Sequence, residues 1–157
     1  MIKLRIAKKE ERHLIENLLQ MYLHNISEYF PIDFNSKTCT YEYDDIGKYF
    51  DESVNYAIIF MNDEDVIGFS LVDFIDNTYV VQEMFILNNY KNKGFGEGCI
   101  TKVFDDFNGD WIIKSLPLSP KSENFWNKTI NKYTDGKFEL EYIGKYNRAV
   151  FKFNNAK

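Results

Sequence analysis

The sequence predicts a mixed α/β domain in which one mostly antiparallel sheet is flanked by helices. Three stretches between residues 56 and 87, rich in Val, Ile, Phe and Tyr, are separated only by turn clusters, which is typical of an antiparallel meander. A glycine-rich turn at residues 94–98 leads into a helical apolar spacing, and the chain ends in two alternating stretches across a short turn. The expected order is strand, two helices, three strands, helix, strand, helix and two strands.

The composition is that of one globular domain. A chain of 157 residues can bury a core, and 45% hydrophobic residues with 27% charged residues argue against a disordered segment. No apolar run approaches the roughly 20 residues of a membrane helix, and the first residues lack the pattern of a secretion signal. We therefore expect a single domain over residues 1–157, located in the cytoplasm and without a membrane partner.

The charge pattern and the cysteines exclude further classes of protein. A net charge of −5 with scattered lysines argues against a nucleic-acid surface, which would need a clustered basic face. Cys39 and Cys99 make neither a disulfide framework nor a metal cluster, and His13 and His24 have no partners at ligand spacing. We expect no nucleic-acid partner and no metal.

The N-terminal part predicts one strand and two helices. Residues 2–6 alternate apolar and polar side chains, which is the period of a half-buried strand. From Lys8 to about Tyr22 the apolar residues share one helical face, and acidic residues lie toward the N-terminal half, where the helix dipole favours carboxylates. The turn-rich residues 30–36 end this unit, and a second, shorter helix is expected at residues 44–51.

The later strands follow from alternation and from turn residues. They are expected at 56–61, 66–74, 79–87, 111–116, 138–143 and 148–153. The last two face each other across residues 144–147 and predict a terminal hairpin.

Two helices are expected between these strands. The apolar spacing after the glycines stops at Asn108-Gly109. Ser119-Pro120 combines a cap residue with a proline at the first helical position, so a helix begins there and runs to about Tyr133.

The glycine-rich turn has the properties of an anion site. The first backbone amides of a helix lack intrahelical partners, and the helix dipole favours negative charge there. Gly94 and Gly96 would let a phosphate approach the backbone, and Lys91 and Lys93 would add positive charge. The turn does not fit a P-loop, a dinucleotide fingerprint or a kinase loop, because its spacing or its context is wrong for each. A glycine-rich helix start without any ligand is the alternative.

A family resemblance lies in the segment Ile86-Leu87-Asn88-Asn89-Tyr90-Lys91-Asn92-Lys93-Gly94-Phe95-Gly96. It resembles the coenzyme A signature of the Gcn5-related N-acetyltransferase (GNAT) superfamily, which is Arg or Gln, two residues, Gly, one residue, then Gly or Ala, after a strand. Lys91 stands where Arg or Gln is usual. The order of elements over nearly the whole chain is also similar to that superfamily. The resemblance implies an N-acetyltransferase with acetyl-CoA as co-substrate.

The resemblance also implies which residues hold coenzyme A. Backbone amides of residues 92–97, namely Asn92, Lys93, Gly94, Phe95, Gly96 and Glu97, would cradle the pyrophosphate. The strand ending at Ile86 would splay from its neighbour and bind the pantetheine arm through Phe85 and Ile86. Lys91 would keep the charge of the usual arginine and lose its bidentate geometry.

Glu83 is the candidate general base. An amine is protonated near neutral pH and must lose a proton before or during its attack on the thioester, and a buried carboxylate has a raised pKa that suits this task. Glu83 lies mid-strand before the loop, where many members of the superfamily supply a base. A solvated or purely structural role for Glu83 is the alternative.

The general acid is left unassigned. Members of the superfamily often place a tyrosine on the last helix, and Trp126 fills that position here, so we expect Trp126 to pack or to face the pantetheine arm. Ser119 replaces the asparagine usual at the start of that helix, and it would bind the arm or only cap the helix.

The acceptor would lie between the helical N-terminal region and the C-terminal hairpin. We expect a small-molecule or peptide amine that attacks acetyl-CoA directly in a ternary complex. Aromatic residues between positions 22 and 49 would form a cation cage or a ring platform, although core packing explains them better. Three alternatives remain: a non-catalytic acyl-CoA sensor or scaffold on the same fold, a transferase that uses a longer acyl chain, and one that acylates an oxygen acceptor. The chain could also form a homodimer.

Overall fold

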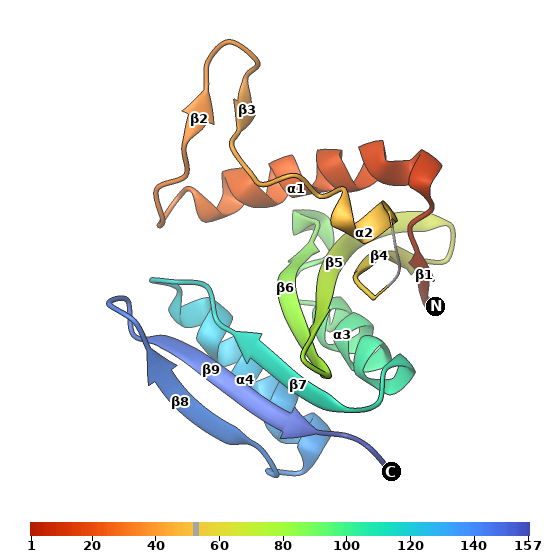
Figure 1. Cartoon of the computed structure of the whole chain (residues 1–157), viewed down its shortest axis with the longest axis vertical. Coiled ribbons are helices and arrows are strands. Elements are labelled where there is room, and N and C mark those ends of the chain that lie inside the picture. Colours follow the sequence, from red (N-terminus) through yellow and green to blue (C-terminus); the bar gives the residue numbers. More distant parts are fainter. Residues whose placement is uncertain (52–53) are drawn as a thin grey trace.

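The computed structural model describes residues 1–51 and 54–157, and its centre is a seven-stranded sheet (Figure 1). The strand order is β1-β4-β5-β6-β7-β9-β8. The strands are β1 (Ile2–Ile6), β4 (Tyr56–Asn62), β5 (Asp65–Ile75), β6 (Thr78–Ile86), β7 (Asp110–Lys114), β8 (Glu139–Ile143) and β9 (Arg148–Asn154). Among these described strands only β6 and β7 pair in parallel, so the expected mostly antiparallel sheet is confirmed.

Helices cover both faces of this sheet. They are α1 (Arg12–Ile26), α2 (Lys48–Asp51), α3 (Phe95–Asp106) and α4 (Pro120–Thr134). Buried side chains of α3 and α4 form one core with the sheet, and those of α1 and α2 form a second core on the other face. None of the described helices is long and apolar enough to cross a membrane.

A short hairpin follows α1 and was not expected. It pairs β2 (Phe34–Asn35) with β3 (Thr40–Tyr41) and stands away from the sheet in Figure 1. Gln20 on α1 holds it, because its side-chain amide donates to the Tyr41 carbonyl at 2.9 Å and its side-chain oxygen accepts from the Tyr41 amide at 2.8 Å. Strands of two residues are too short for periodicity to reveal.

Two helix boundaries differ from the expectation. Residues Lys9–Glu11 form a 3-10 turn, in which the Glu11 carboxylate accepts from the Lys8 amide at 3.1 Å, so α1 begins only at Arg12. The second helix begins at Lys48 and not at residue 44, because the Asp45 carboxylate accepts from the Gly47 amide at 2.9 Å and pairs with Arg12 at 2.6 Å. Such side-chain bonds compete with helical backbone bonds.

A β-bulge in β6 decides which face of the sheet carries Glu83. The β5–β6 register shifts between Leu71 and Val72, so that Gln82 is an extra residue without a partner in this ladder. Val81 therefore packs in the α3–α4 core whereas Phe85 packs in the α1–α2 core, although plain alternation would place both on one face. Glu83 follows the bulge and shares the α1 face with Phe85.

Candidate active site

The strands β6 and β7 part in the middle of the sheet. Their parallel ladder runs from Thr78 and Asp110 to Val81 and Ile113 and ends there, whereas β6 continues to Ile86. Beyond Val81, the described register of β6 pairs it with β5 alone. The second half of β6 thus offers an open row of backbone donors and acceptors, and this is the strand in which a splay was expected.

The direction of each backbone group on this edge follows from the ladder. The Leu87 amide donates to the Ile67 carbonyl at 2.8 Å, so the amide and carbonyl of Phe85, two residues earlier, also face β5. The backbone groups of Met84 and Ile86 then face the open side. Of the two residues expected to offer backbone groups to the pantetheine arm, Ile86 lies on the open side and the main chain of Phe85 faces β5. Met84 offers its backbone on the open side as well, which the sequence could not show because it depends on the strand register.

The loop after β6 forms a backbone concavity at the start of α3. Asn92 (φ 61°) and Gly94 (φ 84°) are left-handed, an alternation that turns successive amides toward one side. Glycine adopts this conformation without a steric penalty. Helical bonding starts with the Gly98 amide, which donates to the Gly94 carbonyl at 3.0 Å. The amides of residues 95–97 have no backbone partner among the described residues and could bind an anion.

Lys91 and Lys93 are the lysines of this loop, and their side chains make different contacts. The Lys91 ammonium lies 5.5 Å from the centre of the Phe85 ring, and burial, with a smaller effect of Lys121, lowers the pKa of Lys91. Lys93 donates to the Asn89 carbonyl at 2.9 Å. The Glu97 carboxylate is drawn to Lys132, at 2.5 Å, while its amide belongs to the first turn of α3.

Trp126 on α4 and Ser119 at its N-terminal cap make contacts that stabilise the fold. Trp126 is only 6% exposed and packs in the core with an edge-on contact to Phe125. The Ser119 hydroxyl oxygen accepts from the Ser122 amide at 3.2 Å and caps the helix. Of the two roles expected for each residue, the structure shows packing for Trp126 and capping for Ser119.

Glu83 is partly buried on the α1 face. The Tyr43 hydroxyl donates to its Oε1 atom at 3.1 Å. Burial raises the pKa of Glu83 to about 6, whereas the hydroxyls of Tyr22 and Tyr43 and the charge of Arg148 oppose this rise. A carboxylate with this pKa can accept a proton near neutral pH.

A second carboxylate, which is fully buried, lies on the neighbouring strand. Asp73 of β5 is 2% exposed, accepts a short hydrogen bond from the Tyr49 hydroxyl and pairs with Lys48 at 2.7 Å. It fixes α2 to the sheet. No local pattern in the sequence marks this residue, because its partners lie more than twenty positions away.

A groove of about 680 Å³ is lined by residues of α1, of the β2–β3 hairpin and of the segment from Phe85 to Asn89. Its lining is aromatic, apolar and amide-bearing: Gln20, Met21, His24, Asn25, Phe34, Cys39, Tyr41, Phe85, Leu87, Asn88 and Asn89. Two of its lining residues are joined directly, because the Asn25 side-chain amide donates to the Asn88 side-chain oxygen at 3.1 Å. Glu83 does not line this groove, but Phe85, which does, lies two positions after Glu83 on the same face of β6.

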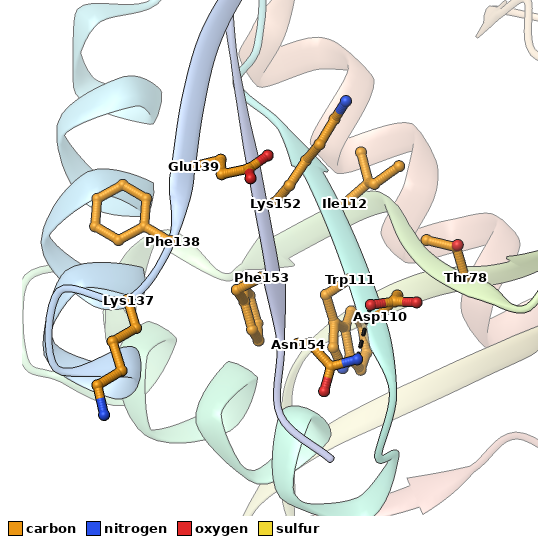
Figure 2. Close-up of a pocket in the computed structure, with 10 residues that line it drawn as sticks. All are labelled: Thr78, Asp110, Trp111, Ile112, Lys137, Phe138, Glu139, Lys152, Phe153 and Asn154. Atoms are coloured by element: carbon orange, nitrogen blue, oxygen red, sulfur yellow. Dashed lines mark hydrogen bonds between the residues drawn. The ribbon is translucent and has the colours of Figure 1, made fainter.

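A second hollow lies elsewhere on the molecule. Figure 2 shows it over β7, β9 and the start of β8, where Asn154 donates to Asp110 at 2.7 Å. Its volume is about 540 Å³, and none of the predicted site residues lines it. Within the described part of the chain, no group of three or more His, Cys, Asp or Glu side chains is placed to hold a metal ion.

No protein-family model and no curated protein sequence matches this chain. Solved structures do match it. An acetyltransferase from Thermus thermophilus has a TM-score of 0.71 at 8% identity, over 98% of this chain and 97% of that one. PaiA N-acetyltransferase from Thermoplasma acidophilum, in complex with coenzyme A, has a TM-score of 0.66 at 12% identity, over 98% and 99%.

An acetyltransferase of the GNAT family from Staphylococcus aureus is similar to the same extent. Its TM-score is 0.64 at 14% identity, over 98% of this chain and 99% of that one. Sequence identities this low carry the fold and not the activity. The chain has the fold of the GNAT acetyltransferases, as its element order predicted.

Proposed function

We propose that this chain is an acetyl-CoA-dependent N-acetyltransferase of the GNAT superfamily, a single transferase domain over residues 1–157. One observation carries the proposal: β6 leaves β7 beside Glu83, and the strand then runs into an amide-lined helix start. A titratable carboxylate, a hydrogen-bonding strand edge and a helix start suited to an anion thus follow one another along residues 83–97, which supports the proposal. The matching fold and the coenzyme A complex of one similar structure support it.

Coenzyme A would lie along the open edge of β6. The free amides of residues 95–97 and the concavity at Asn92 and Gly94 would bind its pyrophosphate, with Lys91 and Lys93 nearby. The backbone groups of Met84 and Ile86 would bind the amides of the pantetheine arm, as an added strand binds a sheet edge.

Glu83 would then accept a proton from the acceptor. The amine nitrogen attacks the thioester carbonyl carbon, its proton passes to Glu83 directly or through a water molecule, and the carbon–sulfur bond breaks to release the coenzyme A thiolate. A thiol of pKa about 8.5, by analogy with cysteine, leaves with little help from an acid. No general acid is assigned, because Trp126 is packed in the core.

The acceptor would enter from the α1 face. The groove that Phe85 lines is large enough for a small molecule or a peptide side chain, and its aromatic and amide side chains suit a polar amine.

A non-catalytic sensor on the same fold is the second candidate. The tryptophan at position 126, where a tyrosine is often found, favours it, whereas a Glu83 carboxyl with a pKa of about 6 favours turnover.

An acceptor screen tests the proposal. The protein is incubated with acetyl-CoA and a panel of primary amines, including aminosugars, diamines and peptides with free N-termini, and release of the coenzyme A thiol is followed together with the mass of each amine. We expect acetylation of at least one amine and no thiol release without it. Coenzyme A binding without any transfer would contradict the transferase and support the sensor.

Lys91→Met tests the phosphate side of the site. Losing one charge near the pyrophosphate should weaken coenzyme A binding by about fivefold, and the remaining affinity should fall less with added salt. Calorimetric titration at two salt concentrations measures both effects. Lys102→Met, an exposed lysine further along α3, is the control and should bind as the wild type does. Equal affinity of the two variants would place Lys91 outside the phosphate site.

A further inference from the structure

We infer that Tyr43 is a positioning residue for Glu83, whose hydroxyl holds the carboxylate in place for proton transfer. The inference rests on the proposed function, in which Glu83 is the base, and it adds a residue from a distant segment of the chain. Tyr43 lies between β3 and α2, 40 positions before Glu83, and its hydroxyl donates to Oε1 at 3.1 Å. The bond fixes one carboxylate oxygen from the face that the acceptor would approach.

The segment that carries Tyr43 is itself fixed to the sheet. Six positions further on, the Tyr49 hydroxyl donates to Asp73, whose other oxygen accepts from Lys48 at 2.7 Å. Asp45, between the two tyrosines, is paired with Arg12 of α1 at 2.6 Å. Two tyrosine hydroxyls from one short segment are thus attached to carboxylates on the neighbouring strands β5 and β6, and these contacts hold Tyr43 over Glu83.

Several charged or titratable groups face Glu83 from the surrounding elements. Tyr22 comes from α1 and Arg148 from β9, and both lower the pKa of Glu83 together with Tyr43. Tyr49 from α2 also feels the Glu83 charge, and Asp73 on β5 acts on Tyr43. Burial has the largest effect and raises the pKa of Glu83 to about 6.

The sign of the expected change follows from these contacts. The Tyr43 hydroxyl donates to the charged carboxylate and stabilises it, so removing the hydroxyl should raise the pKa of Glu83 further. A hydrogen bond to a charged group of ordinary strength corresponds to about one pH unit. At a pH near 6 a smaller share of Glu83 would be ionised, and less of the enzyme could accept a proton.

Tyr43→Phe tests the inference through a pH profile. At saturating acetyl-CoA, the acid limb of kcat/KM for the amine should move to higher pH by about one unit, and the rate should return toward the wild-type value above that limb. The KM for acetyl-CoA should stay unchanged, because Tyr43 does not lie on the open edge of β6. Tyr142→Phe is the matched control, since the Tyr142 hydroxyl also donates to a carboxylate, Glu123, at 2.6 Å.

A titration without substrate gives a second, independent measurement. Carbon-13 NMR of labelled glutamate carboxyls, with the Glu83 signal assigned by its loss in Glu83→Gln, should report a pKa near 6 in the wild type and a higher one in Tyr43→Phe. An unchanged Glu83 titration in Tyr43→Phe, or the same shift in Tyr142→Phe, would overturn the inference. An inactive wild type whose Glu83 titration still shifts would count against the transferase and not against the Tyr43 contact.

Discussion

Glu83→Gln is expected to lower kcat by about 100-fold or more, because a positioned general base commonly contributes factors of this size. Glutamine keeps the shape of the side chain and can still accept from Tyr43, but it cannot take a proton from the amine. The affinity for coenzyme A should not change, since Glu83 faces the α1 side and not the anion loop. Steady-state rates and calorimetric titration of the same preparation measure the two quantities.

The pH profile sharpens this prediction. Burial raises the pKa of Glu83 to about 6, so wild-type activity should rise as the pH passes that value, and the variant should lack this inflection. Glu64→Gln, at an exposed turn, is the control and should keep both the rate and the inflection. A wild-type acid limb that persists unchanged in Glu83→Gln would show that another group is the base.

The Glu83 carboxyl also makes the free energy of unfolding depend on pH, and its raised pKa fixes the direction of that dependence. Its pKa is higher in the folded chain than the ordinary value of 4.5, so the folded state binds the proton more tightly and loses stability as the pH rises from 4.5 through about 6. The loss amounts to about 2 kcal/mol. Urea unfolding at about pH 4.5 and about pH 7.5 should reveal it in the wild type and not in Glu83→Gln.

Among substitutions that add one methyl group to the sheet near the site, Gly68→Ala is expected to destabilise the protein most. A Cβ atom at Gly68 would lie 2.0 Å from the Phe85 carbonyl oxygen, which is backbone and cannot rotate away. Either β5 or the end of β6 must move. We expect a loss of about 3 kcal/mol of unfolding free energy, or a Tm lower by roughly 6–12 °C in a chain of this size.

Thermal unfolding followed by circular dichroism measures the effect. Gly144→Ala is the matched control, because Gly144 has a φ of 72° and an added Cβ meets no atom within 4 Å. Its cost should be only the backbone strain, about 1 kcal/mol. A Gly68→Ala protein as stable as Gly144→Ala would mean that β5 and β6 are not packed as closely as described.

The sequence sufficed for features that depend on neighbouring residues. Alternation and turn clusters located the meander, and the Ser119-Pro120 pair located the start of α4, because both are local signals. Glu83 became the candidate base through the family resemblance, which points to this place on the strand before the glycine loop. The sequence could not show whether the Glu83 side chain is buried or exposed to solvent, since this depends on the bulge at Gln82, which turns it toward the α1 face.

Features that depend on residues far apart in the chain could not be predicted from the sequence. The contact from Tyr43 to Glu83 and the pairing of Asp73 with Lys48 join segments that only the folded chain brings together. The direction in which the backbone amide of Phe85 points could not be predicted either, because it depends on the pairing with β5.

Calorimetric titration of the wild-type protein with coenzyme A tests the central claim most directly, because every step of the proposed reaction starts from that complex. The open edge of β6 and the amide concavity at residues 92–97 predict saturable binding of one coenzyme A molecule per chain in the micromolar range, weakened by salt. Absence of binding at millimolar coenzyme A would contradict the account.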